Sequence, residues 1–89
     1  MARFEIADLN AAGLGQAPMG ADTFYELGMM YSIGRSVPAD LVSAHKWFNL
    51  AAMRGNDDAK QYRWEISREM SKIQISRAQR LAREWISKH

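Results

Sequence analysis

Apolar residues recur at helical spacing in four stretches of the chain. In the first stretch Phe24, Leu27 and Tyr31 stand at i, i+3 and i+7, so that they share one face of a helix. The second stretch extends from Leu41 to Arg54 and has a wider apolar face, which consists of Leu41, Ala44, Trp47, Phe48 and Ala51. Both stretches predict amphipathic helices.

Two further apolar stripes follow in the second half of the chain. The third stripe consists of Ala59, Tyr62, Ile66 and Met70, and the fourth of Ile75, Ala78, Leu81, Ala82 and Trp85. Because the connections between the four predicted helices are short, consecutive helices should lie antiparallel to each other. The pattern therefore predicts an all-α fold of two antiparallel helix hairpins.

Capping motifs predict where three of these helices begin. Thr23 with Glu26, and Ser71 with Gln74, match the capping box, in which the side chain at each end of the first turn accepts a hydrogen bond from the backbone N–H of the other. Asp40 precedes the second apolar stretch and is a typical N-cap residue. The first helix should therefore begin at Asp22 or Thr23, and the fourth directly after the third.

Glycines predict where two helices end and where two helices come close. Gly34 and Gly55 follow the first and second stretches, in the position where a left-handed residue usually terminates a helix. The third helix should then begin at Asn56 or Asp57. Gly28 lies within the first helix, where glycine costs about 1 kcal/mol relative to alanine, so we expect it to allow close approach of a neighbouring helix.

Residues 1–20 differ from the rest of the chain. They are rich in glycine and alanine, and the segment from Gly13 to Pro18 interrupts any helix. We predict that residues 1–20 form a flexible N-terminal arm. Residues 21–89 should form one helical domain, since a chain of 89 residues is too short for two.

Composition limits the environment and the kinds of site that the chain can have. The sequence has no cysteine, so disulfides and thiolate metal sites are excluded. No apolar run approaches the length of a membrane span, and the segment from Met1 to Asp8 contains acids where a signal peptide needs an uninterrupted apolar run. We expect a cytoplasmic protein that does not associate with a membrane.

One segment of the chain resembles a known repeat. It contains Leu27-Gly28-x-x-Tyr31-x-x-Gly34, Asp40 at the end of a loop, Ala44-x-x-Trp47-Phe48, Ala51-Ala52-x-x-Gly55, and Ala59. This pattern is similar to the Sel1-like repeat, and it departs from that repeat at Ser36, where the family often has glycine. The resemblance covers residues 21–59.

The Sel1-like resemblance implies an α/α superhelix related to tetratricopeptide arrays. Residues 21–57 would be one full repeat, and residues 58–89 a degenerate capping hairpin. Proteins of this family typically act as adaptors or scaffolds in bacterial and eukaryotic signalling. The resemblance therefore implies a non-catalytic protein that binds a peptide or helix of a protein partner.

The residues themselves offer little for catalysis. The chain has two histidines: His89 is its last residue, and we expect His45 to be a solvated residue on a helix surface. No metal-binding or nucleotide-binding motif is present. We therefore expect no enzymatic activity, no cofactor and no metal site.

Surface aromatic residues and methionines give the best indication of a binding site. Trp64 points about 160° away from Tyr62 on the third helix, hence off the apolar stripe. Such side chains are typical interface anchors or adaptable contacts. The predicted contact residues are Tyr25, Met29, Ser32, Arg63 and Trp64. Alternatively, the aromatic and methionine side chains pack against the arm or the core, or a homodimer closes the short array.

Charge is unevenly distributed along the chain. Residues 1–53 contain three bases and five acids, whereas residues 54–89 contain nine bases and five acids. The bases considered for binding are Arg63, Arg68, Lys72, Arg77, Arg80, Arg83 and Lys88. They form a solvated face, a surface for an acidic protein partner, or a nucleic-acid surface. A small nucleic-acid-binding protein that uses the C-terminal helices is therefore the alternative function, and the less favoured one.

Overall fold

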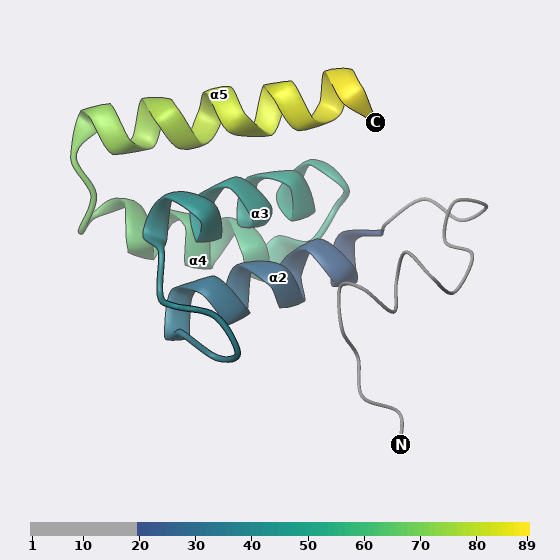
Figure 1. The fold of residues 1–89 in the computed structure, drawn as a ribbon. Coiled ribbons are helices and arrows are strands. Elements are labelled where there is room, and N and C mark those ends of the chain that lie inside the picture. The colour runs from purple at the N-terminus through teal and green to yellow at the C-terminus, as the bar shows by residue number, and fades with distance from the viewer. Residues whose placement is uncertain (1–19) are drawn as a thin grey trace.

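The computed structural model describes residues 20–89 and contains four helices, labelled as in Figure 1. They are α2 (Ala21–Ile33), α3 (Leu41–Met53), α4 (Asp57–Ser67) and α5 (Lys72–Lys88). The prediction of an all-α fold with four helices is confirmed, and residues 20–89 contain no strand. The predicted arm lies outside the described residues, apart from Gly20.

Three helices begin at the predicted caps. The Asp40 side chain accepts hydrogen bonds from the backbone N–H groups of Val42 and Ser43, and Asn56 Oδ1 accepts one from the Ala59 N–H at 2.8 Å. Ser71 and Gln74 form both hydrogen bonds of the capping box, at 3.1 and 2.9 Å. These starts are fixed by local contacts, which is why the sequence predicts them.

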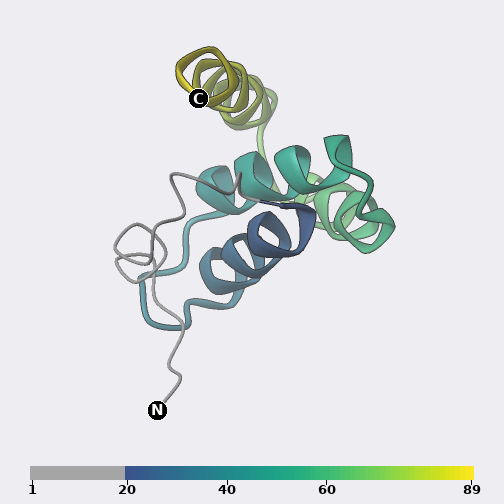
Figure 2. The same cartoon turned by 90° about the vertical axis from the view of Figure 1, so that its right-hand side faces the viewer.

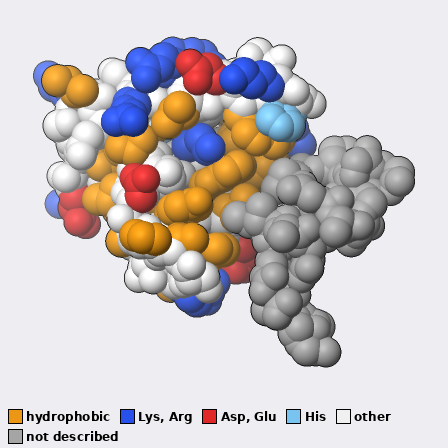
Figure 3. All heavy atoms as spheres, in the orientation of Figure 1, with side chains coloured by type: hydrophobic (Ala, Val, Ile, Leu, Met, Phe, Trp, Pro, Cys, Tyr) orange, Lys and Arg blue, Asp and Glu red, His pale blue; other side chains and the backbone are white. Residues whose placement is uncertain are grey.

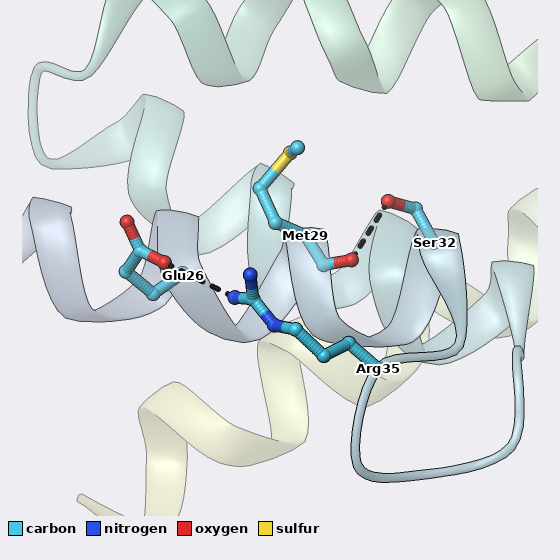
Figure 4. A network of polar contacts seen from close by, with 4 residues as sticks. All are labelled: Glu26, Met29, Ser32 and Arg35. Atoms are coloured by element: carbon cyan, nitrogen blue, oxygen red, sulfur yellow. Dashed lines mark hydrogen bonds and ion pairs between the residues drawn. The ribbon is translucent and has the colours of Figure 1, made fainter. Parts of the chain in front are cut away.

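The predicted capping box at Thr23 and Glu26 is wrong. Helix α2 begins at Ala21, one or two residues before the predicted start, and Gly20 occupies the N-cap position without a side-chain hydrogen bond. Glycine is tolerated there, so the helix extends past Thr23. Glu26 instead pairs with Arg35 beyond the helix end, at 3.6 Å (Figure 4).

The C-terminal ends of α2 and α3 are closed by left-handed residues. Gly34 has φ 76° and its N–H donates to the Met30 carbonyl, while Gly55 has φ 99°. Ser36, in the same loop as Gly34, also has a positive φ, of 70°. Left-handed backbone costs about 1–2 kcal/mol for a residue with a side chain, so this serine occupies a conformation that suits glycine.

Helix α3 lies at the centre of the fold. Successive helices reverse direction (Figure 1), and α2, α4 and α5 each pack against α3 (Figure 2). The second hairpin is splayed, because α5 lies over α3 and makes few contacts with α4, its neighbour in the chain. The buried stripe of α5 includes Ala78 and Ala82, whose small side chains allow close approach to α3.

The first hairpin is closed by the contact that Gly28 permits. A Cβ atom at this position would lie 2.5 Å from Cδ1 of Phe48, which is fully buried. The predicted role of Gly28 in close helix approach is therefore confirmed. The glycine brings the backbone of α2 against an aromatic ring of α3.

Two aromatic triads extend from α3 to the other helices. Phe24, Trp47 and Trp85 connect α2, α3 and α5, with ring centroids 5.1–6.2 Å apart. Tyr25, Phe48 and Tyr62 connect α2, α3 and α4, with centroids 5.6–6.0 Å apart. Residues 24 and 25 are neighbours, as are 47 and 48, so adjacent positions on α2 and α3, about 100° apart around each helix, contribute to different triads.

Candidate interaction surface

Three of the five predicted contact residues share one face of α2. Tyr25, Met29 and Ser32 are spaced i, i+4 and i+7, and all three are half-buried. The Ser32 hydroxyl donates to the Met29 carbonyl at 3.1 Å, and the Met29 side chain projects away from Arg35 (Figure 4). Because Tyr25 and Met29 pack against the core, only part of each is accessible to a partner.

Tyr25 has a structural role in addition to any role in binding. Its ring lies against Phe48 of α3 and Tyr62 of α4, each with its centroid 6.0 Å away. Burial raises the pKa of the Tyr25 hydroxyl, and Tyr62 and the Asp58 carboxylate raise it further. The neutral phenol therefore helps to join three helices.

Arg63 is held by the fold. Its Nη1 donates to Asn49 Oδ1 on α3 at 2.7 Å, and the side chain is half-buried. A charge-assisted hydrogen bond of this length is among the stronger polar contacts in a small domain. Arg63 therefore fastens α4 to α3, and a partner would have to compete with Asn49 for it.

The interpretation of His45 as a solvated surface residue is wrong. The side chain is 3% exposed, and its Nδ1 is buried without a hydrogen-bond partner among the described residues. Burial lowers the pKa of His45, and the nearby Arg63 guanidinium lowers it further. His45 stands four residues after Leu41 and three before Phe48, at the edge of the apolar face of α3, and Arg63 of α4 lies close enough to affect its pKa.

Trp64 is the predicted contact residue that the fold uses least. It is 57% exposed on α4, and it is the one aromatic residue among the exposed large apolar side chains of residues 20–89. The Arg68 guanidinium lies over its ring at 5.0 Å from the centroid. A shallow depression on α4 contains both side chains together with Glu65 and Glu69.

The five predicted residues do not form one continuous surface. Tyr25 contacts Tyr62, whereas Trp64 lies two residues further along α4, which turns its direction by about 200°. Tyr62, which contacts Tyr25 of α2, and Trp64 therefore lie on different sides of α4. Trp64 and Arg68 form an exposed pair on their own.

Among the exposed large apolar residues that sequence reasoning did not single out, Ile73 is the most exposed. It is 81% exposed in the first turn of α5 and lies in a shallow depression with Lys72, Ser76, Arg77 and Arg80. The signal was present in the sequence: Ile73 is about 200° from Ile75, which belongs to the buried stripe. The regular stripe that begins two positions later, at Ile75, makes this signal less obvious.

Residues 20–89 contain no group of three or more acidic or histidine side chains that could hold a metal ion. None of the four described helices is long and apolar enough to span a membrane.

Comparisons with known proteins add no relative. No family model, no curated protein and no solved structure matches the chain.

Proposed function

We propose that this chain is a non-catalytic adaptor that binds a segment of a protein partner on its helical surface, with Trp64 as the principal contact. The observation that supports this most directly is the exposure of Trp64 beside Arg68. An exposed tryptophan is costly in solvent and is the residue type most enriched among binding hot spots. The other aromatic rings on α2–α5 are packed in or against the core, whereas Trp64 is exposed, so its ring is accessible to a partner.

The proposal also draws on the resemblance of residues 21–59 to the Sel1-like repeat. Stacked helical repeats leave an extended surface on which a peptide or helix can dock. Tyr25, Met29, Ser32 and Arg63 would then make secondary contacts through their accessible parts. These four residues also have roles in the fold, so their substitution would report on stability as well as on binding.

The test compares Trp64→Ala with Met53→Ala in affinity capture from the native host. Met53 is a matched control, because it is a large apolar residue of α3 that is 60% exposed. Loss of a hot-spot tryptophan should weaken binding by about 2 kcal/mol or more. We expect the captured protein to be lost with Trp64→Ala and retained with Met53→Ala, while both variants keep the wild-type melting temperature.

Two outcomes would contradict the proposal. If both variants capture the same partner equally well, Trp64 is not its contact. If sedimentation shows that the wild type is a dimer and Trp64→Ala is a monomer, the residue mediates self-association and the homodimer hypothesis replaces the adaptor.

The alternative function, nucleic-acid binding by α4 and α5, rests on the bases of α5. Duplex binding driven by phosphate contacts should weaken steeply as salt rises, and a gel-shift titration measures this. The exposed Ile73 side chain favours a protein partner, since it would gain nothing from a phosphate backbone.

A further inference from the structure

The outer face of α5 is a second exposed surface, and its character differs from that of the Trp64 surface. Helix α5 carries five bases, Lys72, Arg77, Arg80, Arg83 and Lys88, and one acid, Glu84. Figure 3 shows Lys and Arg side chains gathered along the α5 edge of the molecule. This helix therefore has a strongly positive outer face.

The fold uses little of this charge. Arg80 pairs with Glu84 at 3.7 Å, and both side chains are more than half exposed, so this pair contributes little to stability. The other four bases of α5 make no ion pair within residues 20–89. Their charges are available to a partner without the loss of an internal contact.

Ile73 lies among these bases. It is 81% exposed, and Arg77 and Arg80 follow it at i+4 and i+7, on the same face of α5. An isoleucine in this position gains nothing from the fold, and it would gain free energy only if a partner removed it from water. The surface thus combines one apolar contact with two guanidinium groups.

We infer that the Ile73, Arg77 and Arg80 face of α5 binds an acidic protein segment that presents an apolar side chain between carboxylates. Carboxylates match the fork of arginine donors, and the apolar side chain covers Ile73. This surface is separate from the Trp64 surface, so the inference goes beyond the proposed function and does not depend on it.

Two other anionic partners fit the same face less well. Nucleic-acid phosphates would neutralise the arginines but leave Ile73 in water. An anionic membrane requires a broad apolar helix face, whereas the apolar stripe of α5, with Ala78, Ala82 and Trp85, is packed against the rest of the fold. The combination of charge and one exposed isoleucine therefore favours an acidic protein segment.

The inference can be tested by fluorescence anisotropy with the full chain. The probe is a short fluorescein-labelled peptide that alternates glutamate and leucine. Two reference peptides replace either the glutamates by glutamine or the leucines by serine. We expect the probe to bind, with an affinity that falls as salt rises, and both reference peptides to bind about tenfold more weakly or not at all.

Variants then locate the binding surface. The double variant Arg77→Gln/Arg80→Gln should weaken binding of the probe by about tenfold or more, and Ile73→Ser by several-fold. Lys60→Gln is the matched control, because Lys60 is an exposed base on α4. It should leave binding unchanged, as should Trp64→Ala.

Three results would overturn the inference. They are failure of the glutamate–leucine probe to bind, equal binding of the glutamate–serine peptide, and tighter binding of labelled duplex DNA or anionic vesicles than of the probe. Loss of the captured partner in Trp64→Ala, together with no binding of the probe, would support the adaptor and reject this inference. The two proposals therefore fail separately.

Discussion

The two helix hairpins of this chain are built differently. In the first, Gly28 brings α2 against Phe48 of α3, and the pair is tightly closed. In the second, α5 packs over α3 and makes few contacts with α4. Helix α3 thus serves as the packing partner of every other described helix. A hairpin in the sequence therefore becomes a packed hairpin only when its facing side chains permit close approach.

The linkers of the two hairpins also differ, in their backbone conformation. The first linker has two left-handed residues, Gly34 and Ser36, which turn the chain sharply back on itself. In the second linker, the Glu69 and Met70 N–H groups donate hydrogen bonds to the carbonyls of Ile66 and Ser67, which extends the last turn of α4. Ser71 then has an extended backbone conformation. Both hairpins leave large apolar side chains exposed, Ile33 and Met53 in the first and Trp64, Ile73 and Ile86 in the second.

The first hairpin should be the more sensitive to a single added methyl group. In Gly28→Ala the new Cβ would meet the Phe48 ring at 2.5 Å, a contact that requires the two helices to separate. The cost of overpacking should exceed the gain in helix propensity, leaving a net loss of about 2 kcal/mol. Thermal unfolding should show a fall in melting temperature of roughly 10 °C.

The matched control for Gly28→Ala is Gln79→Ala on the exposed face of α5, which should change the melting temperature little. A double-mutant cycle adds a second check. Phe48→Leu should cost less in the Gly28→Ala background than in the wild type, because the smaller side chain makes room for the new methyl group. If the two substitutions are additive, the glycine does not act through Phe48.

The junction between the first hairpin and α4 should respond to acid. Burial and the Arg63 charge lower the pKa of His45 in the folded chain. In the unfolded chain the histidine has its ordinary pKa of 6.5, so at lower pH the unfolded chain binds a proton that the folded chain does not bind. The contribution of His45 to stability should therefore be present above pH 6.5 and should decrease as the pH falls through 6.5 towards 5. Urea unfolding at each pH measures this.

Two histidine variants separate this junction from the rest of the molecule. His45→Leu should flatten the dependence of stability on pH between 7 and 5, since it removes the buried titrating group. His89→Gln is the control, since His89 lies at the exposed end of α5, where its ring stacks on Trp85 with centroids 4.3 Å apart. An unchanged slope in His45→Leu would show that other groups cause the acid sensitivity.

Sequence reasoning succeeded for most local features, although it failed for the Thr23 capping box, and it was less complete where a feature depends on a neighbouring helix. Asp40, Ser71 and Gly34 act within a few residues of their own position, so their roles follow from the sequence. The position of α5 over α3 depends on how these two helices fit together. No pattern within a single helix contains that information.

The same limit applies to the candidate site. The exposure of Trp64 follows from its angle to the apolar stripe, and the sequence predicts it correctly. The hydrogen bond from Arg63 to Asn49 and the ring contact between Tyr25 and Tyr62 could not be predicted, because each contact joins two helices. The sequence therefore identified accessible residue types better than it identified which of them the fold already uses.

The smallest effects expected here distinguish the two linkers. Ser36 has φ 70°, so Ser36→Gly removes the cost of a left-handed serine, although glycine also gains freedom in the unfolded chain. The net result should be a gain of about 0.5 kcal/mol and a rise in melting temperature of roughly 3 °C.

Ser71→Gly makes the same change in the second linker and should have the opposite sign. Ser71 has φ −76° and ψ 163°, which any residue adopts, and its hydroxyl accepts the hydrogen bond from the Gln74 N–H. Glycine loses this bond and relieves no strain, so stability should fall by a few tenths of a kcal/mol. If both substitutions change the stability in the same direction, the left-handed backbone at Ser36 is not what distinguishes the two linkers.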